Sequence, residues 1–109
     1  MAKTANEGLT LPNFLVLGAQ RAGTTMLHRL LTVHPEVFVP TRRKEVHYFD
    51  RYYERGVRWY AGYFPDQNLH RSYRAIGEIT PDYLADPRVP ERIAGTLPGC
   101  RLIAILRDP

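Results

Sequence analysis

The sequence predicts an α/β protein in which helices flank an open parallel sheet. Apolar runs suited to buried strands alternate with helix-patterned segments along most of the chain. The first run, Phe14–Leu17, leads through a loop bracketed by Gly18 and Gly23 directly into a helical pattern. The last run, Arg101–Leu106, has the near-continuous apolar character of a strand buried on both faces. Right-handed crossovers between such strands bring their carboxyl ends to one edge, where ligands of open sheets bind.

The first half of the chain supplies two strands around one helix. Phe14–Leu17 is apolar and β-compatible, so we expect a buried strand. Thr24–His34 carries apolar residues at helical spacing, and Pro35 ends the pattern. Val37–Val39 has the length of a short strand and is closed by a proline.

The second half repeats the alternation. Gly56–Phe64 is aromatic on one side and ends before Pro65, which predicts a short amphipathic helix. Tyr73–Ile79 predicts an inner strand. Asp86 followed by proline predicts a helix cap with proline in the first turn, leading to a helix that ends near Leu97. Arg101–Leu106 is the clearest buried strand and ends in Arg107; we expect a sheet truncated after it, because no covering helix follows.

Composition limits the functional classes. The 109 residues suit one domain, with residues 1–12 as a flexible tail, and the net charge of +4 suits an anionic ligand. Arg42, Arg43 and Lys44 form the only cationic triplet, too short to predict nucleic-acid binding. The single cysteine, Cys100, excludes an internal disulfide and is expected to pack as a small apolar side chain. No signal peptide or membrane segment is predicted, so we expect a cytoplasmic protein of undetermined oligomeric state.

The glycine loop predicts a phosphate-binding site. Gly18 and Gly23 have the G-x-x-x-x-G spacing of a P-loop, so the sheet is expected to be of the P-loop type. Thr24 stands where an ATP-hydrolysing P-loop requires lysine, which disfavours that chemistry. Backbone N–H groups of Ala22, Gly23 and Thr24, with the hydroxyls of Thr24 and Thr25, can still hold a phosphate. A nucleotide kinase or other phosphotransferase, and a glycine turn without a ligand, remain alternatives.

Three ordered motifs resemble sulfotransferases that use 3′-phosphoadenosine 5′-phosphosulfate. Gly18–Thr25 resembles their 5′-phosphosulfate loop, Lys44–Asp50 resembles the K-E-x-x-[FY]-F segment of the heparan-sulfate-type enzymes, and Ile105–Pro109 resembles the start of their 3′-phosphate motif. Gly77–Tyr83 resembles a further block, except that Ile79 replaces the lysine of heparan-acting members. Residues 13–109 would then form the N-terminal part of a sulfotransferase-like P-loop domain.

The resemblance implies transfer of a sulfuryl group by in-line displacement to a hydroxyl or amine, on a carbohydrate or small molecule, with no metal. Glu45 would be the general base, Lys44 would contact the sulfuryl group or the substrate, and His47 with Asp50 would orient the site. Arg21 would stabilise the leaving phosphate where the family more often has lysine. The implied donor-binding residues are Gln20, Arg21, Ala22, Gly23, Thr24, Thr25 and Arg107. A non-catalytic nucleotide-binding fragment is the remaining alternative.

Overall fold

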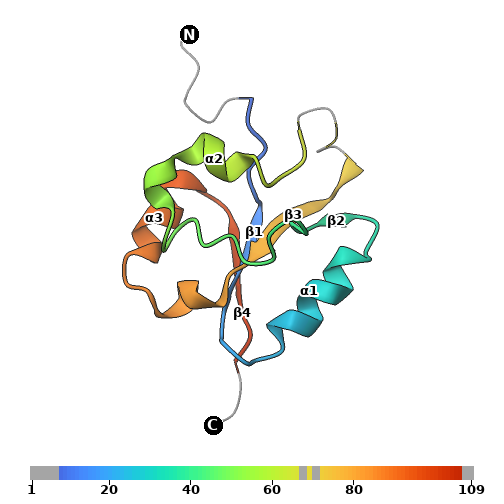
Figure 1. The fold of residues 1–109 in the computed structure, drawn as a ribbon, viewed down its shortest axis with the longest axis horizontal. Coiled ribbons are helices and arrows are strands. Elements are labelled where there is room, and N and C mark those ends of the chain that lie inside the picture. The colour runs from blue at the N-terminus through green and yellow to red at the C-terminus, as the bar shows by residue number, and fades with distance from the viewer. Residues whose placement is uncertain (1–7, 67–68, 70–71, 107–109) are drawn as a thin grey trace.

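Four parallel strands form one sheet in the order β2–β3–β1–β4 (Figure 1). The strands are β1 (Phe14–Gly18), β2 (Val37–Phe38), β3 (Ala75–Ile79) and β4 (Arg101–Ala104). This computed structural model describes residues 8–66, 69 and 72–106. The predicted open parallel sheet is confirmed, and β1, which carries the glycine loop at its end, is an inner strand between β3 and β4.

Helices cover the two faces of the sheet unequally. The helix α1 (Thr24–Thr32) packs on the face to which Phe14 and Val16 point. The helices α2 (Val57–Ala61) and α3 (Val89–Thr96) lie on the opposite face with Leu15. Two short 3-10 helices, η1 (Tyr53–Arg55) and η3 (Pro81–Ala85), complete that side. Among the described residues no helix is long and apolar enough to cross a membrane.

The core under α2 and α3 is aromatic. Tyr48 stacks on Tyr60 with ring centroids 4.3 Å apart and an interplanar angle of 9°. Phe49 meets the rings of Tyr60 and Tyr83 edge to face, at 5.3 and 5.6 Å. Such ring pairs stabilise the fold beyond the burial of the apolar rings themselves, and they restrict how the backbone between them can move. Cys100 packs at the margin of this core, and burial raises the pKa of its thiol to about 11, as expected for a packed side chain rather than a nucleophile.

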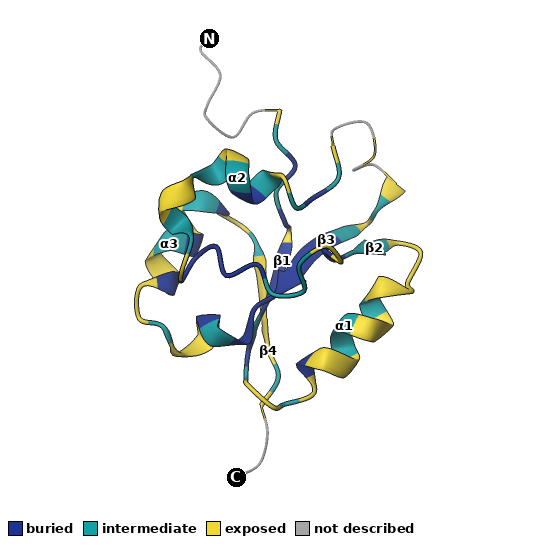
Figure 2. Ribbon diagram, in the orientation of Figure 1, coloured by how far each residue is buried: buried dark blue, intermediate teal, exposed yellow. Residues whose placement is uncertain are grey.

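The prediction that the last strand is the most buried was wrong. All four residues of β4 are exposed, as Figure 2 shows, and Leu102 and Ile103 keep 52% and 43% of their surface accessible. Within the described chain β4 pairs only with β1, so it is an edge strand whose apolar residues lack covering elements. The regular strand also ends at Ala104 rather than at residue 106.

Several element boundaries differ from expectation; the helices α1 and α2, for example, end at Thr32 and Ala61 rather than at His34 and Phe64. The helix α3 begins at Val89, with Pro90 in its first turn; Asp86 instead accepts hydrogen bonds from the backbone and side chain of Arg88 in the turn before it. In the segment expected to be a tail, Thr10 and Pro12 are buried, so packing begins before residue 13. Residues 1–7 lie outside the described part of the chain.

Candidate active site

In the loop after β1, the backbone of Gly18 passes close to the backbone of η3. Gly18 has a φ of 152°, and a Cβ added there would lie 2.8 Å from the Pro81 carbonyl oxygen, so a side chain at this position would collide with η3. The loop is tied to the chain after β4 by two hydrogen bonds of 2.8 Å, from the Ala19 amide to Ile105 and from the Ile105 amide to Gly18. The glycine loop and the end of the last strand therefore share one edge of the sheet, as predicted.

The N-terminus of α1 opens toward this loop. Its N-cap is Gly23, in the left-handed conformation with φ of 92°, and the cap provides no side-chain hydrogen bond. The first-turn N–H groups of an α-helix have no partner inside the helix, and together with the helix dipole they favour an anion. Thr24 is buried, whereas the neighbouring Thr25 is exposed. The sequence thus forms an anion-binding helix end from glycine and small hydroxyl residues.

A cleft of about 290 Å³ joins this helix end to the segment after β2. Lys44 reaches across it and donates a 2.6 Å hydrogen bond from Nζ to the Thr25 hydroxyl. Glu45 lies on the same wall, with 35% of its side chain exposed. The cleft is lined by Gln20, Arg21, Gly23, Thr24, Thr25, Lys44, Glu45, Ile79 and Pro81. Seven of the residues named from sequence therefore meet in one place.

Of the remaining predicted residues, Ala22 lies within the loop, between Arg21 and Gly23, and its amide donates to the Ala19 carbonyl. His47 is buried next to Glu45, with its Nε2 3.6 Å from Glu45 Oε1. Arg107 lies outside the described residues. A larger groove runs between α1 and β4, but its lining is mostly apolar, including Phe14, Leu31 and Ile103. The smaller cleft gathers the titratable groups and is the candidate active site.

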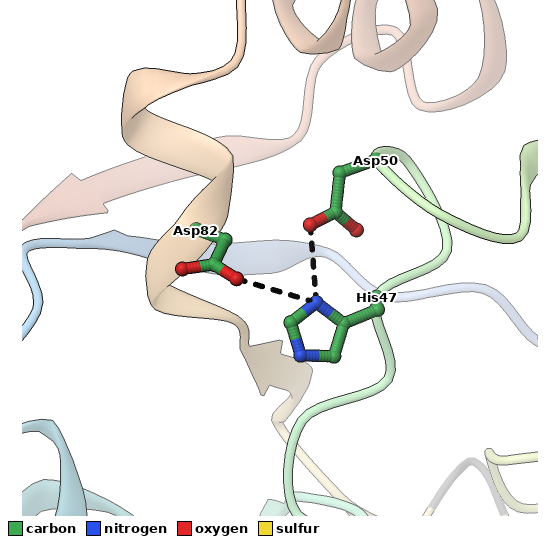
Figure 3. A group of neighbouring side chains, drawn as sticks. All are labelled: His47, Asp50 and Asp82. Carbon is green, nitrogen blue, oxygen red and sulfur yellow. Dashed lines mark hydrogen bonds and ion pairs between the residues drawn. The ribbon is translucent and has the colours of Figure 1, made fainter.

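His47 lies close to three carboxylates, of which Figure 3 shows Asp50 and Asp82. Its Nδ1 lies 3.0 Å from Asp50 Oδ2 and 3.9 Å from Asp82 Oδ2, while its Nε2 lies 3.6 Å from Glu45 Oε1. Nδ1 lies within hydrogen-bond distance of Asp50 Oδ2, and this contact fixes the orientation of the ring. His47 also has a left-handed backbone, with φ of 58°, that turns its ring back under Glu45.

Asp82 was not predicted as a site residue, yet it joins the two walls of the cleft. Its Oδ1 accepts a 2.5 Å hydrogen bond from Gln20 Nε2, and its Oδ2 accepts a 3.1 Å hydrogen bond from Arg51 Nη2. In the described chain His47, Asp50 and Asp82 each offer one potential ligand atom, all within 4.8 Å of one another. Those atoms are already engaged with one another and with Arg51, an arrangement typical of an ion-pair network.

Sequence analysis also missed Glu78 and the hydroxyl groups around it, which lie in the core. Glu78 in β3 is fully buried and accepts hydrogen bonds from the hydroxyls of Tyr60, Thr80 and Tyr83. Burial raises the pKa of Glu78, and the three hydroxyl donors oppose that shift. The available signal was positional: Thr80–Tyr83 follows an inner strand at the edge where the glycine loop lies.

Comparison with known proteins places these features in a family. A sequence profile of the sulfotransferase family matches residues 12–91. The chain is 41% identical over 101 residues to the membrane-associated sulfotransferase kil1 of Dictyostelium discoideum, covering 93% of this chain and 21% of that protein. It is 37% identical over 98 residues to the heparan sulfate glucosamine 3-O-sulfotransferase 6 of Mus musculus, covering 90% of this chain and 27% of that protein.

A bifunctional heparan sulfate N-deacetylase/N-sulfotransferase 3 of Homo sapiens is 36% identical over 105 residues, which cover 91% of this chain and 12% of that protein. The crystal structure of a sulfotransferase from Alicyclobacillus acidocaldarius is similar in fold, with a TM-score of 0.65 and 26% identity, over 88% of this chain and 44% of that one. The chain therefore spans about a quarter or less of the length of these curated relatives.

Proposed function

The chain belongs to the sulfotransferase family, and from that premise we propose that its cleft binds 3′-phosphoadenosine 5′-phosphosulfate and supports transfer of the sulfuryl group to a hydroxyl or amine acceptor. One observation carries this proposal. The anion-binding end of α1 and the Glu45 carboxylate line the same cleft, with Lys44 connecting its two walls. A transferable anion and a base for its acceptor are then within reach of each other.

The donor side acts through backbone and positive charge. The amides at the start of α1, with the hydroxyls of Thr24 and Thr25, would hold the 5′-phosphate of the donor. Arg21 and Lys44 line the cleft and supply cations for the oxygens on which charge develops as the bond between sulfur and the bridging oxygen breaks. The leaving 3′,5′-bisphosphate keeps the electron pair of that bond. Arg107 would bind the 3′-phosphate.

The acceptor side acts through Glu45. Its carboxylate takes the proton of the acceptor hydroxyl or amine as the new bond to sulfur forms. His47, whose Nε2 lies 3.6 Å from Glu45 Oε1 and whose Nδ1 is held by Asp50, would orient that carboxylate. The partly exposed Glu45 faces the cleft while His47 stays buried, which suits a base supported from behind.

A carbohydrate is the acceptor class that the surroundings favour. Two of the relatives named above are heparan sulfate sulfotransferases. In this chain Arg42 and Arg43, next to Lys44, lie over the rings of Tyr63 and Tyr52 at 4.4 and 4.7 Å from the ring centroids. Guanidinium groups held in place on aromatic faces suit an anionic ligand such as a sulfated carbohydrate. Family membership disfavours the nucleotide kinase that the loop spacing alone leaves open.

Calorimetry tests the donor assignment. Titration with 3′-phosphoadenosine 5′-phosphate should give a dissociation constant at least about tenfold lower than titration with ADP, since the 3′-phosphate adds charge-assisted hydrogen bonds. Arg21→Ala should weaken binding, whereas Arg29→Ala, an exposed arginine in the last turn of the same helix, should leave it unchanged. Equal affinities for the two nucleotides in a folded sample would contradict the proposal. Binding without any transfer would instead support the non-catalytic alternative.

A further inference from the structure

Glu78 is a carboxylate placed in the core, where it accepts hydrogen bonds from three hydroxyls. Its Oε2 accepts hydrogen bonds from Tyr60 Oη at 2.5 Å and Tyr83 Oη at 2.8 Å, and its Oε1 accepts one from Thr80 Oγ1 at 2.5 Å. The side chain has no exposed surface. A buried charge is costly unless it is fully hydrogen-bonded, so a group of this kind is kept for what it organises.

Two of these three hydroxyls also contact the segment that carries the candidate base. Thr80 Oγ1 accepts the backbone N–H of His47 at 3.3 Å. Tyr83 Oη accepts the N–H groups of Tyr48 and Phe49, at 2.9 and 3.4 Å. A hydroxyl has one proton, and here that proton points at Glu78. Only the oxygen lone pairs then face the segment, and these are what its N–H groups need.

The same segment is held by its carbonyl groups from the other side. Arg88 donates to the Asp50 carbonyl at 2.9 Å, and Arg92 donates to the Phe49 carbonyl at 3.0 Å. His47 at the start of this turn has a left-handed backbone, and its carbonyl accepts local hydrogen bonds from the Arg51 and Tyr52 amides. The long-range contacts add to these local bonds, so the position of the turn depends on the direction of the two hydroxyls.

We propose that Glu78 is a positioning residue for sulfuryl transfer. Through the hydroxyls of Thr80 and Tyr83 it fixes the His47–Asp50 turn, and through His47 it fixes the Glu45 carboxylate in the cleft. This inference rests on the proposed function, in which Glu45 takes the acceptor proton. It also gives a reason for a carboxylate at position 78, because an amide there would present an N–H in place of one acceptor and would turn a hydroxyl away from the segment.

Two tyrosines provide a matched test. Tyr60→Phe and Tyr83→Phe each remove one hydrogen bond to Glu78 Oε2, but only the Tyr83 hydroxyl also accepts N–H groups of the turn. The ring of Tyr60, which stacks on Tyr48, is kept in Tyr60→Phe. In the full chain, Tyr83→Phe should lower kcat by about tenfold or more with little change in the donor KM, since a small displacement of a catalytic group has effects of this order. Tyr60→Phe should stay within about twofold of the unaltered chain. Equal losses in the two variants, or no loss in Tyr83→Phe, would overturn the proposal.

A second measurement separates this proposal from the function it rests on. Backbone amide exchange at Tyr48 and Phe49 should be about tenfold faster in Tyr83→Phe and unchanged in Tyr60→Phe, because one hydrogen-bond acceptor is lost. Thr80→Ser, which keeps the hydroxyl, should retain kcat, whereas Thr80→Val should lose it. All four variants should bind 3′-phosphoadenosine 5′-phosphate as the unaltered chain does. Failure of the unaltered chain to bind it would refute the function, whereas equal exchange in the two tyrosine variants would refute the positioning role.

Discussion

The two walls of the cleft are built in opposite ways. The proposed donor loop, Gly18–Thr25, exposes the side chains of Gln20, Arg21 and Thr25, and the backbone of a helix end would contact the donor. The acceptor wall continues from Glu45 into Val46–Asp50, in which every residue is buried. Its backbone is held by side chains more than thirty positions away along the chain, such as Tyr83. Substitutions in the donor loop should therefore change affinity, whereas substitutions in the acceptor wall should change rate.

The largest expected effect follows from replacing Glu45. Glu45→Gln keeps the size of the side chain and removes the base, so kcat should fall by about 10²- to 10⁴-fold. The dissociation constant of 3′-phosphoadenosine 5′-phosphate should stay nearly unchanged, because the donor loop is intact. Glu54→Gln, an exposed glutamate in η1, is the matched control and should retain activity. Turnover near the original rate in Glu45→Gln would show that the acceptor wall does not supply the base.

A smaller effect is expected where the walls meet, at Lys44. Lys44→Met removes the ammonium that contacts Thr25 and keeps most of the apolar stem, so donor affinity should fall roughly three- to tenfold. The loss should shrink as salt is added, since the group is partly exposed. Arg42→Met removes a neighbouring cation that lies over Tyr63, outside the cleft lining, and should leave donor affinity unchanged. Equal losses in both variants would mean that only general charge attracts the donor.

The difference between the two walls of the cleft also explains which features could be predicted from the sequence. The strand, glycine loop and helix over Phe14–Thr32 were predicted because they are local features, readable from spacing, whereas the binding roles of the loop residues remain predictions. The open parallel sheet followed from the alternation of apolar runs. Glu45 and Lys44 were also named, through a resemblance between motifs, and they line the predicted cleft. Their roles, and that of Arg107, remain predictions.

What sequence analysis missed depends on contacts across the sheet. Asp82 reaches Gln20 and Arg51 only because η3 packs against the loop after β1. Glu78 looks like an ordinary polar residue in a strand until the register of β3 points it into the aromatic core. The burial of β4 was predicted wrongly because the prediction used its apolar content without its neighbouring elements. Apolar content indicates which residues can be buried, but the neighbouring elements decide which ones are.

The smallest expected effect tests the outer support of the acceptor wall. Arg88 Nη2 donates to Asp86 Oδ2 at 2.7 Å and also to the Asp50 carbonyl, so Asp86 holds the arginine against the turn. The hydrogen bond from the Arg88 side chain lowers the pKa of Asp86 from an ordinary value near 3.8 to about 2. A carboxylate with a lowered pKa in the folded state stabilises the fold above its ordinary pKa, and the contribution disappears as the pH falls through about 2.

Asp86→Asn should therefore lower the melting temperature by a few degrees at most at neutral pH, since the pair is near the surface and screened by solvent. The difference from the unaltered chain should decrease below about pH 4 and vanish only below about pH 2, where Asp86 is protonated and, like the asparagine that replaces it, uncharged. Thermal unfolding followed by circular dichroism at several pH values measures this directly. A difference that does not change with pH would mean that Asp86 acts through the shape of its turn alone. The hydrogen bonds from Arg88 and Arg92 to the carbonyls of the turn would then hold the outer side without help from the charge of Asp86.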